Sequence, residues 1–171
     1  MRDMNNFRLY RRVGMLLLAI LIAGISVFAV PAESPYKAQQ VSVDGVTVAR
    51  LTDAARGVEV SVLPSLGNIA YEMKIHGKNI LVFPDMALSD FQKRPTQTGI
   101  PFMAPWANRL DGDAFWANGK RYLLDSTLGN YRKDGNGFPL HGLLTPSTPW
   151  RIKDMGADKG SAHVTSRLEF W

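Results

Sequence analysis

The stretch VEVSVLPSLGNIAYEMKIHGKNIL, residues 58–81, decides the fold class. Apolar and polar side chains alternate on either side of its central LPSLGN, with the apolar ones at Val58, Val60, Val62, Ile69, Tyr71, Met73 and Ile75. Side chains of a β-strand point alternately to its two faces, so this alternation predicts two half-buried strands. The following HGKN, residues 76–79, predicts a turn into a third strand at residues 80–83.

Two further hairpins are indicated along the chain. Asn118–Gly119 separates residues 114–117 from 120–124, and this dipeptide favours the positive φ angles of a tight hairpin turn. The loop GADKG separates strands expected at residues 150–155 and 162–170. Short strands divided by turn signals predict an all-β, antiparallel sandwich or barrel.

Little else in the chain has a regular pattern. Residues 85–98 are the best helical candidate, and Pro95 ends that helix early. The glycine-rich segment at residues 129–137 is interpreted as a flexible loop.

The first 32 residues differ from the rest. Four arginines precede an uncharged apolar run at residues 13–30, and the small residue Ala32 follows. This arrangement predicts a secretory signal peptide over residues 1–32. The run has 18 residues, the lower limit for a membrane span, so an uncleaved anchor is the alternative. In either case we expect an exported protein, periplasmic or extracellular, that meets a membrane only through residues 13–30.

The remaining residues are expected to form a polar spacer and a single domain. Pro-containing, polar residues begin the spacer, which is placed at residues 33–44, and the domain is placed at residues 45–171. The length of 171 residues leaves room for one such domain.

Composition excludes several classes of function. The net charge is +5, but residues 1–32 carry +3 of it, which leaves only +2 for residues 33–171. So small a charge gives no reason to expect a nucleic-acid partner. The chain has no cysteine, and it lacks the motifs of nucleotide-binding loops, zinc proteases and serine hydrolases. We therefore expect no metal and no cofactor.

Three histidines can be weighed one by one. His76 falls in a predicted turn and His163 on the polar side of a predicted strand, so both are interpreted as exposed. His141 differs because it lies in FPLHGLL, among apolar residues and directly before Gly142. It is either a hydrogen-bonded core residue or a functional one, and the adjacent glycine permits close approach of another group.

A second candidate site is the pair Asn108–Arg109, which follows the apolar Pro105–Trp106. Arginine keeps its charge and offers five fixed donors. The alternative is an ordinary surface arginine, or one in an ion pair with Asp111 or Asp113. An aromatic face beside Asn, Arg and His donors suits a neutral polyol ligand.

These residues resemble the aldose 1-epimerases, or galactose mutarotases. The resemblance extends over roughly residues 45–170 and rests on Pro101, Pro105, Asn108–Leu110, Gly112, Phe115, Asn118–Lys120, Tyr122, Leu124 and Leu140–Gly142, with the opening hairpins at residues 58–81. It implies a large antiparallel β-sandwich, and interconversion of the α and β anomers of hexoses such as glucose or galactose without metal or nucleotide.

The resemblance also implies roles for single residues. Arg109 binds sugar hydroxyls, His141 lies in the sugar pocket, and Asn108 and Trp106 are further substrate-binding candidates. His141 is the one catalytic candidate. The glutamate base and the second histidine of the family have no matching motif here and are expected beyond Trp171. The chain is therefore interpreted as the N-terminal part of an exported mutarotase, inactive by itself.

Two other interpretations remain open. The chain is alternatively a non-catalytic carbohydrate-binding module of the same fold, in which Arg109, Trp106 and His141 only bind. The third interpretation is an anchored β-domain without a sugar ligand.

Overall fold

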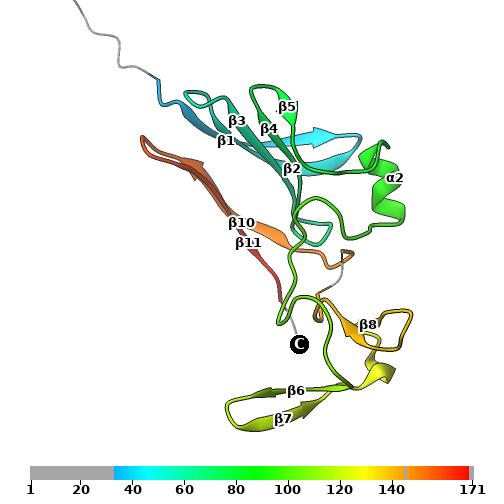
Figure 1. Cartoon of the computed structure of the whole chain (residues 1–171). Helices are drawn as coiled ribbons and strands as arrows, with labels where there is room; N and C mark the ends of the chain where they lie inside the picture. Colours follow the sequence, from blue (N-terminus) through cyan, green and yellow to red (C-terminus); the bar gives the residue numbers. More distant parts are fainter. Residues whose placement is uncertain (1–32, 145, 170–171) are drawn as a thin grey trace, which may run out of the picture. The chain divides into compact units, whose positions relative to one another are not determined.

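The computed structural model describes residues 33–144 and 146–169, and almost all of its regular structure is β-strand (Figure 1). The strands are β1 (Tyr36–Val43), β2 (Val46–Asp53), β3 (Val58–Leu63), β4 (Ile69–Ile75), β5 (Lys78–Asn79), β6 (Ala114–Ala117), β7 (Lys120–Leu123), β8 (Arg132–Lys133), β9 (Pro139–Leu140), β10 (Arg151–Ala157) and β11 (Ala162–Arg167). A short helix α2 (Leu88–Lys93) and a 3-10 turn η1 (Ser126–Leu128) complete the set. Every strand pair in these ranges is antiparallel, which confirms the expected β class. The predicted signal or anchor at residues 1–32 lies outside the described residues.

The first five strands form one sheet in chain order, β1-β2-β3-β4-β5. A two-residue turn joins β1 to β2, with φ angles of 50° at Asp44 and 81° at Gly45. Positive φ at both positions suits the right-handed twist of the flanking strands. The turn also sets the register, in which Val43 pairs with Val46 and Val41 with Val48.

Strands β3 and β4 are the two that the alternating stretch predicts. Val58 pairs with Ile75, and Val60 with Met73. A register shift between Ser61 and Val62 interrupts the ladder. Such a bulge bends a strand and strengthens its twist.

The prediction of a strand at residues 80–83 is wrong, because β5 ends at Asn79. The side chain of Asn79 accepts hydrogen bonds from the backbone N–H groups of Met73 and Leu81, both at 3.1 Å. One backbone bond to β4 continues past β5, from the Ile80 N–H to the Met73 carbonyl at 2.9 Å. The chain beyond pairs instead with residues 98–99, where the Gly99 N–H donates to the Val82 carbonyl at 3.0 Å.

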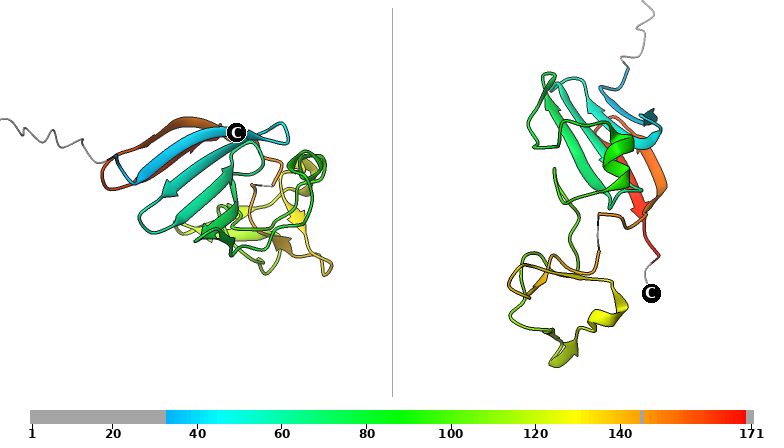
Figure 2. Two further views of the ribbon diagram at one scale, coloured as in Figure 1. Left: turned by 90° about the horizontal axis from the view of Figure 1, so that it is seen from above. Right: turned by 90° about the vertical axis from the view of Figure 1, so that its right-hand side faces the viewer.

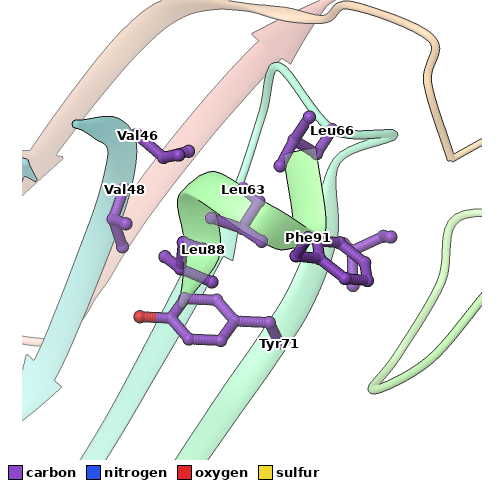
Figure 3. Packing of buried hydrophobic residues seen from close by; sticks show 8 residues of the cluster. Val46, Val48, Leu63, Leu66, Tyr71, Leu88 and Phe91 are labelled. Carbon is purple, nitrogen blue, oxygen red and sulfur yellow. The ribbon is translucent and has the colours of Figure 1, made fainter. Parts of the chain in front are cut away.

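The hydrophobic core lies between this sheet and α2 (Figure 3). Its buried members are Val46, Val48, Leu63, Leu66, Ile69, Tyr71, Leu88 and Phe91. Leu88 and Phe91, three positions apart, share the helix face that meets the sheet. The Phe83 ring packs between Tyr71 and Phe91, at centroid distances of 5.2 and 4.7 Å.

Helix α2 falls within the predicted helical segment and ends before Pro95, as expected. Its first turn is held by the β1–β2 turn, since the Leu88 N–H donates to Asp44 Oδ2 at 2.9 Å. The helix is thereby attached to the sheet by its buried side chains and by this hydrogen bond.

The two other predicted hairpins are confirmed. β6 and β7 flank Asn118–Gly119, where both φ angles are positive. β10 and β11 pair around the expected loop and lie against β1 and β2 (Figure 2). Ser34 Oγ donates to the Asp158 carbonyl in that loop at 2.6 Å.

Two expectations about loops need correction. The spacer placed at residues 33–44 contains strand β1, which pairs with β2 along its whole length. Two adjacent polar residues, Gln39 and Gln40, break the alternation of this strand and hide it in the sequence. The segment at residues 129–137 includes strand β8, which pairs with β9, so it is not a free loop throughout.

No helix within residues 33–144 and 146–169 has the length and apolar character to cross a bilayer.

Candidate functional site

The pair Asn108–Arg109 is fixed by a short ladder of backbone bonds to residues 139–141. The Leu110 N–H donates to the Pro139 carbonyl at 3.0 Å, and the His141 N–H donates to the Asn108 carbonyl at 2.9 Å. Arg109 thereby forms an antiparallel bridge with Leu140. The structure thus brings His141 next to Asn108 and Arg109, which lie 33 and 32 positions before it in the sequence.

His141 and Asn108 hold each other through a second bond. The Asn108 backbone N–H donates to Nδ1 of His141 at 3.1 Å. A neutral imidazole has one donor and one acceptor nitrogen, so a Nδ1 that accepts leaves the proton on Nε2. Both residues have positive φ, 63° at Asn108 and 65° at His141, a backbone conformation that non-glycine residues seldom adopt. The pairing sets His141 as an Nε2–H donor beside Arg109.

The charge state of His141 follows from its surroundings. Burial lowers the pKa of its imidazole, and the positive charges of Arg132 and Arg109 lower it further. All three causes disfavour the protonated ring. His141 is therefore a neutral hydrogen-bonding group at neutral pH rather than a cation.

Gly142 allows the Pro105–Trp106 segment to approach. A Cβ at this position would lie 2.1 Å from the Ala104 carbonyl oxygen and 3.0 Å from that of Trp106. Its φ of 80° also favours glycine. The Leu143 N–H donates to the Ala104 carbonyl at 2.8 Å, and the Ala104–Pro105 peptide is cis. The group that approaches Gly142 closely is thus the backbone of Ala104 and Trp106.

Arg109 is held by an ion pair that the sequence analysis did not find. Its Nε donates to Asp134 Oδ2, and its Nη1 donates to Asn108 Oδ1 at 3.1 Å. Asp111 and Asp113, the partners considered from sequence, are not bonded to it in the described chain, and Asp113 pairs with Lys133 at 2.8 Å. Nη2 takes no part in these two contacts, and the arginine side chain is 53% exposed. The guanidinium is therefore oriented but still open to a ligand.

Asp134 in turn organises the loop that carries it. Its Oδ1 accepts from the backbone N–H groups of Asn136 and Phe138, at 2.9 and 3.0 Å. The hydrogen bond from Arg109 lowers the pKa of the Asp134 carboxyl, and the bond from Phe138 adds to this effect. Asp134 is a positioning residue for Arg109. The sequence DGNG at residues 134–137 is typical of a turn, but nothing in the sequence links Asp134 to a residue 25 positions away.

Trp106 belongs to a row of aromatic rings. Its ring packs against Phe115 at a centroid distance of 5.8 Å, and Phe115 stacks on Tyr122 at 5.1 Å. The Trp106 Nε1 is buried and has no hydrogen-bond partner among the described residues. Contact of Trp106 with a ligand would therefore be made by its ring rather than its N–H.

Arg132 is a further site residue that the sequence analysis missed. It pairs with Leu140 on the side of β9 opposite Arg109, and its Nη2 donates to Gln97 Oε1. A cavity of about 40 Å³ lies beside it, and its lining includes Gln97, Arg132, Leu140, His141 and Gly142. A volume of this size holds a water but not a hexose, whose pockets are several times larger. The cavity is therefore too small for a hexose, and its lining does not include Asn108 or Arg109.

The other histidines lie elsewhere. His76 occupies the β4–β5 turn, with a φ of 48°. His163 Nε2 is 2.9 Å from Asp154 Oδ2 on the β10–β11 hairpin. Both side chains are exposed, as the sequence predicted. Over the described ranges no group of three or more His, Asp or Glu residues is arranged to hold a metal.

Comparison with known proteins gives a structural likeness. No family model and no curated protein matches the chain. A galactose mutarotase-like protein from Clostridium acetobutylicum matches with a TM-score of 0.57 and 25% identity. The chain has an aldose epimerase-like fold. A galactose 1-epimerase from Lactobacillus acidophilus gives a TM-score of 0.52 at 16% identity, which supports the fold alone.

Each match covers 74% of this chain. The chain spans only 36% of the length of each of these two solved structures. The epimerase-like fold agrees with the β class and with the resemblance noted in the sequence.

Proposed function

We propose that the chain binds an aldose such as galactose or glucose through Asn108, Arg109 and His141, as part of an aldose 1-epimerase-like protein with a β-sandwich domain. The observation that carries this proposal is the mutual pairing of Asn108 and His141, which sets a neutral Nε2–H donor beside an oriented guanidinium. The fold shared with a galactose mutarotase-like protein supports it.

The chemistry of these groups suits a polyol. A guanidinium presents several N–H donors to neighbouring hydroxyl oxygens, and the imidazole Nε2–H adds another. The ring of Trp106 offers an apolar face for the C–H side of a sugar. A neutral His141 also avoids the repulsion that a second positive charge would meet beside Arg109.

Exchange of anomers needs two proton-transfer groups. A base takes the proton of the C1 hydroxyl while an acid protonates the ring oxygen, and each group contributes a factor of about 10²–10⁴. The described residues bring one imidazole to the site. Asp134 is engaged by Arg109 and two backbone N–H groups, which lower its pKa and make it a weak base. We therefore expect these 171 residues to bind sugar without accelerating anomer exchange.

The same observation favours a second candidate function, a non-catalytic carbohydrate-binding module. In that case His141 only donates a hydrogen bond, and the intact protein binds an aldose without interconverting its anomers.

Calorimetric titration with galactose, together with polarimetry, tests these proposals. Arg109→Gln should weaken binding about tenfold or more, because hydrogen bonds to charged groups are worth about 1.5–3 kcal/mol. Arg121→Gln is the matched control, since Arg121 is an exposed arginine on the β6–β7 hairpin, and it should bind as the parent does. Absence of binding would contradict the proposal, and protein-dependent mutarotation would show that the chain holds its own acid and base.

We also propose that the protein is exported through residues 1–32. The support is the order of basic residues, apolar run and small residue in the sequence. The mass of the exported protein tests it, because cleavage after Ala32 would leave a chain beginning at Glu33. A chain that keeps residues 1–32 and stays with the membrane would favour the anchor, and one found only in the cytoplasm would contradict export.

A further inference from the structure

A cavity of about 500 Å³ lies at the end of the β10–β11 hairpin, apart from the residues of the sugar site. Its lining includes Arg151, Ile152, Lys153, Arg167, Leu168 and Glu169. The volume is within the range of small-molecule sites, which is about 300–1,000 Å³. The cavity is thus large enough for a compact organic ligand.

The charges of this cavity do not balance. The strand register places Arg151 directly opposite Arg167, so two guanidinium groups extend from the same face of the hairpin. Like charges directly opposite each other destabilise a strand pair. Lys153 adds a third cation two residues further along β10. The hairpin therefore presents three positive charges close together, which an anion would balance.

Acidic side chains compensate little of this charge. Glu169 Oε1 lies 3.6 Å from Arg167 Nη2, and both side chains are at least 60% exposed, so solvent screens the pair. Asp154, the next residue on β10, is engaged by His163 at 2.9 Å. Within the part of the chain that the structure describes, Arg151 and Lys153 form no ion pair. Three cations face one carboxylate.

We propose that this cavity binds a small ligand that carries an oxyanion, a phosphate, sulfate or carboxylate group, between Arg151, Arg167 and Lys153. A guanidinium matches the two oxygens of such a group with two parallel N–H donors, and an ammonium adds a point charge. Ile152 and Leu168 supply apolar surface for the body of the ligand. This site does not depend on the sugar site or on the function proposed for it.

Titration of the full chain with inorganic phosphate, at constant ionic strength, tests the proposal by calorimetry. The parent chain should bind phosphate saturably, and Arg151→Gln and Arg167→Gln should each raise the dissociation constant about tenfold. Arg121→Gln should leave it unchanged, because this arginine lies opposite Trp116 rather than opposite another cation. Parallel titrations with sulfate and acetate identify the preferred group.

Thermal unfolding gives a second readout that separates the site from general salt effects. Phosphate stabilises most proteins by exclusion from their surface, and this contribution is common to all variants. Binding adds a gain that the Arg151→Gln/Arg167→Gln double variant should lose. Without phosphate, Arg151→Gln should unfold at a higher temperature than the parent, because the repulsion between the two arginines is removed.

Three results would overturn the proposal. The first is a lack of saturable binding of phosphate, sulfate and acetate. The second is equal binding by the parent and the double variant. The third is an equal loss of binding in Arg121→Gln, which would reveal a diffuse attraction to positive charge rather than a site.

Discussion

The five-stranded sheet with α2 and the segment at residues 99–144 are stabilised in different ways. The sheet and the helix enclose a core of eight buried apolar side chains. Between residues 99 and 144 only Pro139 and Gly142 are buried, while Trp116 and Leu123 are each 72% exposed. Backbone hydrogen bonds, left-handed residues and the Arg109–Asp134 ion pair hold the second region.

The sheet and α2 supply most of the stability, whereas residues 99–144 fix the positions of the candidate site residues. Burial of apolar surface is the larger favourable term in folding, so the sheet and α2 dominate the free energy of unfolding. Directional bonds contribute less each but fix positions closely. Changes in the first region should therefore reduce stability, and changes in the second should reduce ligand binding.

The largest expected effect is that of Phe91→Ala. Phe91 lies on the buried face of α2, is 1% exposed and packs against Phe83. Removal of a buried aromatic ring leaves a cavity and should lower the free energy of unfolding by about 3–5 kcal/mol. Denaturant unfolding measures the change. Leu128→Ala is the control, since Leu128 is 67% exposed and its loss should cost under about 0.5 kcal/mol. Equal costs would contradict the difference between the two regions.

Gly142→Ala comes next, with an expected cost of about 1–3 kcal/mol. The added Cβ would lie 2.1 Å from the Ala104 carbonyl oxygen, and that backbone must move to accommodate it. Galactose affinity and denaturant unfolding are measured together, and affinity should fall because the Pro105–Trp106 segment is displaced. Gly119→Ala is matched in its positive φ but has no atom within 4 Å of the added Cβ. It should keep its sugar affinity, and a loss equal to that of Gly142→Ala would contradict the argument from close approach.

Asp134→Asn should have a smaller effect, on affinity more than on stability. The change keeps the shape of the side chain but removes the charge that orients Arg109. Ion pairs with an exposed member contribute up to about 1 kcal/mol, so galactose affinity should fall by at most about fivefold. The control Asp113→Asn removes the carboxylate that pairs with Lys133, and it should bind as the parent does. If Asp134→Asn binds like the parent, Asp134 does not position Arg109.

The smallest expected effect is a pH dependence from His141. Its pKa is lowered in the folded chain, chiefly by burial, so the unfolded chain takes up the proton more readily. The stability contributed by the neutral ring is complete above the ordinary histidine pKa of about 6.5 and declines as the pH falls below it. The thermal midpoint of the parent should therefore fall from about pH 7 to pH 5 more steeply than that of His141→Gln. Parallel curves for the two proteins would contradict this assignment.

The sequence predicts strands where alternation is unbroken and misses those where it is not. β3, β4 and the hairpins β6–β7 and β10–β11 are found from periodicity and turn residues. β1 is missed because Gln39 and Gln40 interrupt its pattern, although Asp44–Gly45 was an available hairpin signal. β5 ends at Asn79, whose side chain accepts a hydrogen bond from the Met73 N–H. The alternation of apolar and polar residues does not predict such a bond.

The site is predictable only in part, for a similar physical reason. The sequence offers Arg109 and His141 as candidates, and the resemblance to the aldose 1-epimerases implies their roles. Their contact depends on the pairing of residues 108–110 with 139–141, and the positions of Asp134 and Arg132 follow from that pairing. Contacts between distant segments are set by the packed chain, so periodicity and motif spacing do not reveal these two partners.

The most direct test of the proposed sugar site is an NMR titration of the three histidine rings with galactose. His76 and His163 lie outside the site and serve as internal controls. We expect a saturable shift of the His141 ring signals, its loss in Arg109→Gln, and no shift of the other two rings. Unchanged His141 signals at saturating galactose, or equal shifts of all three rings, would contradict it.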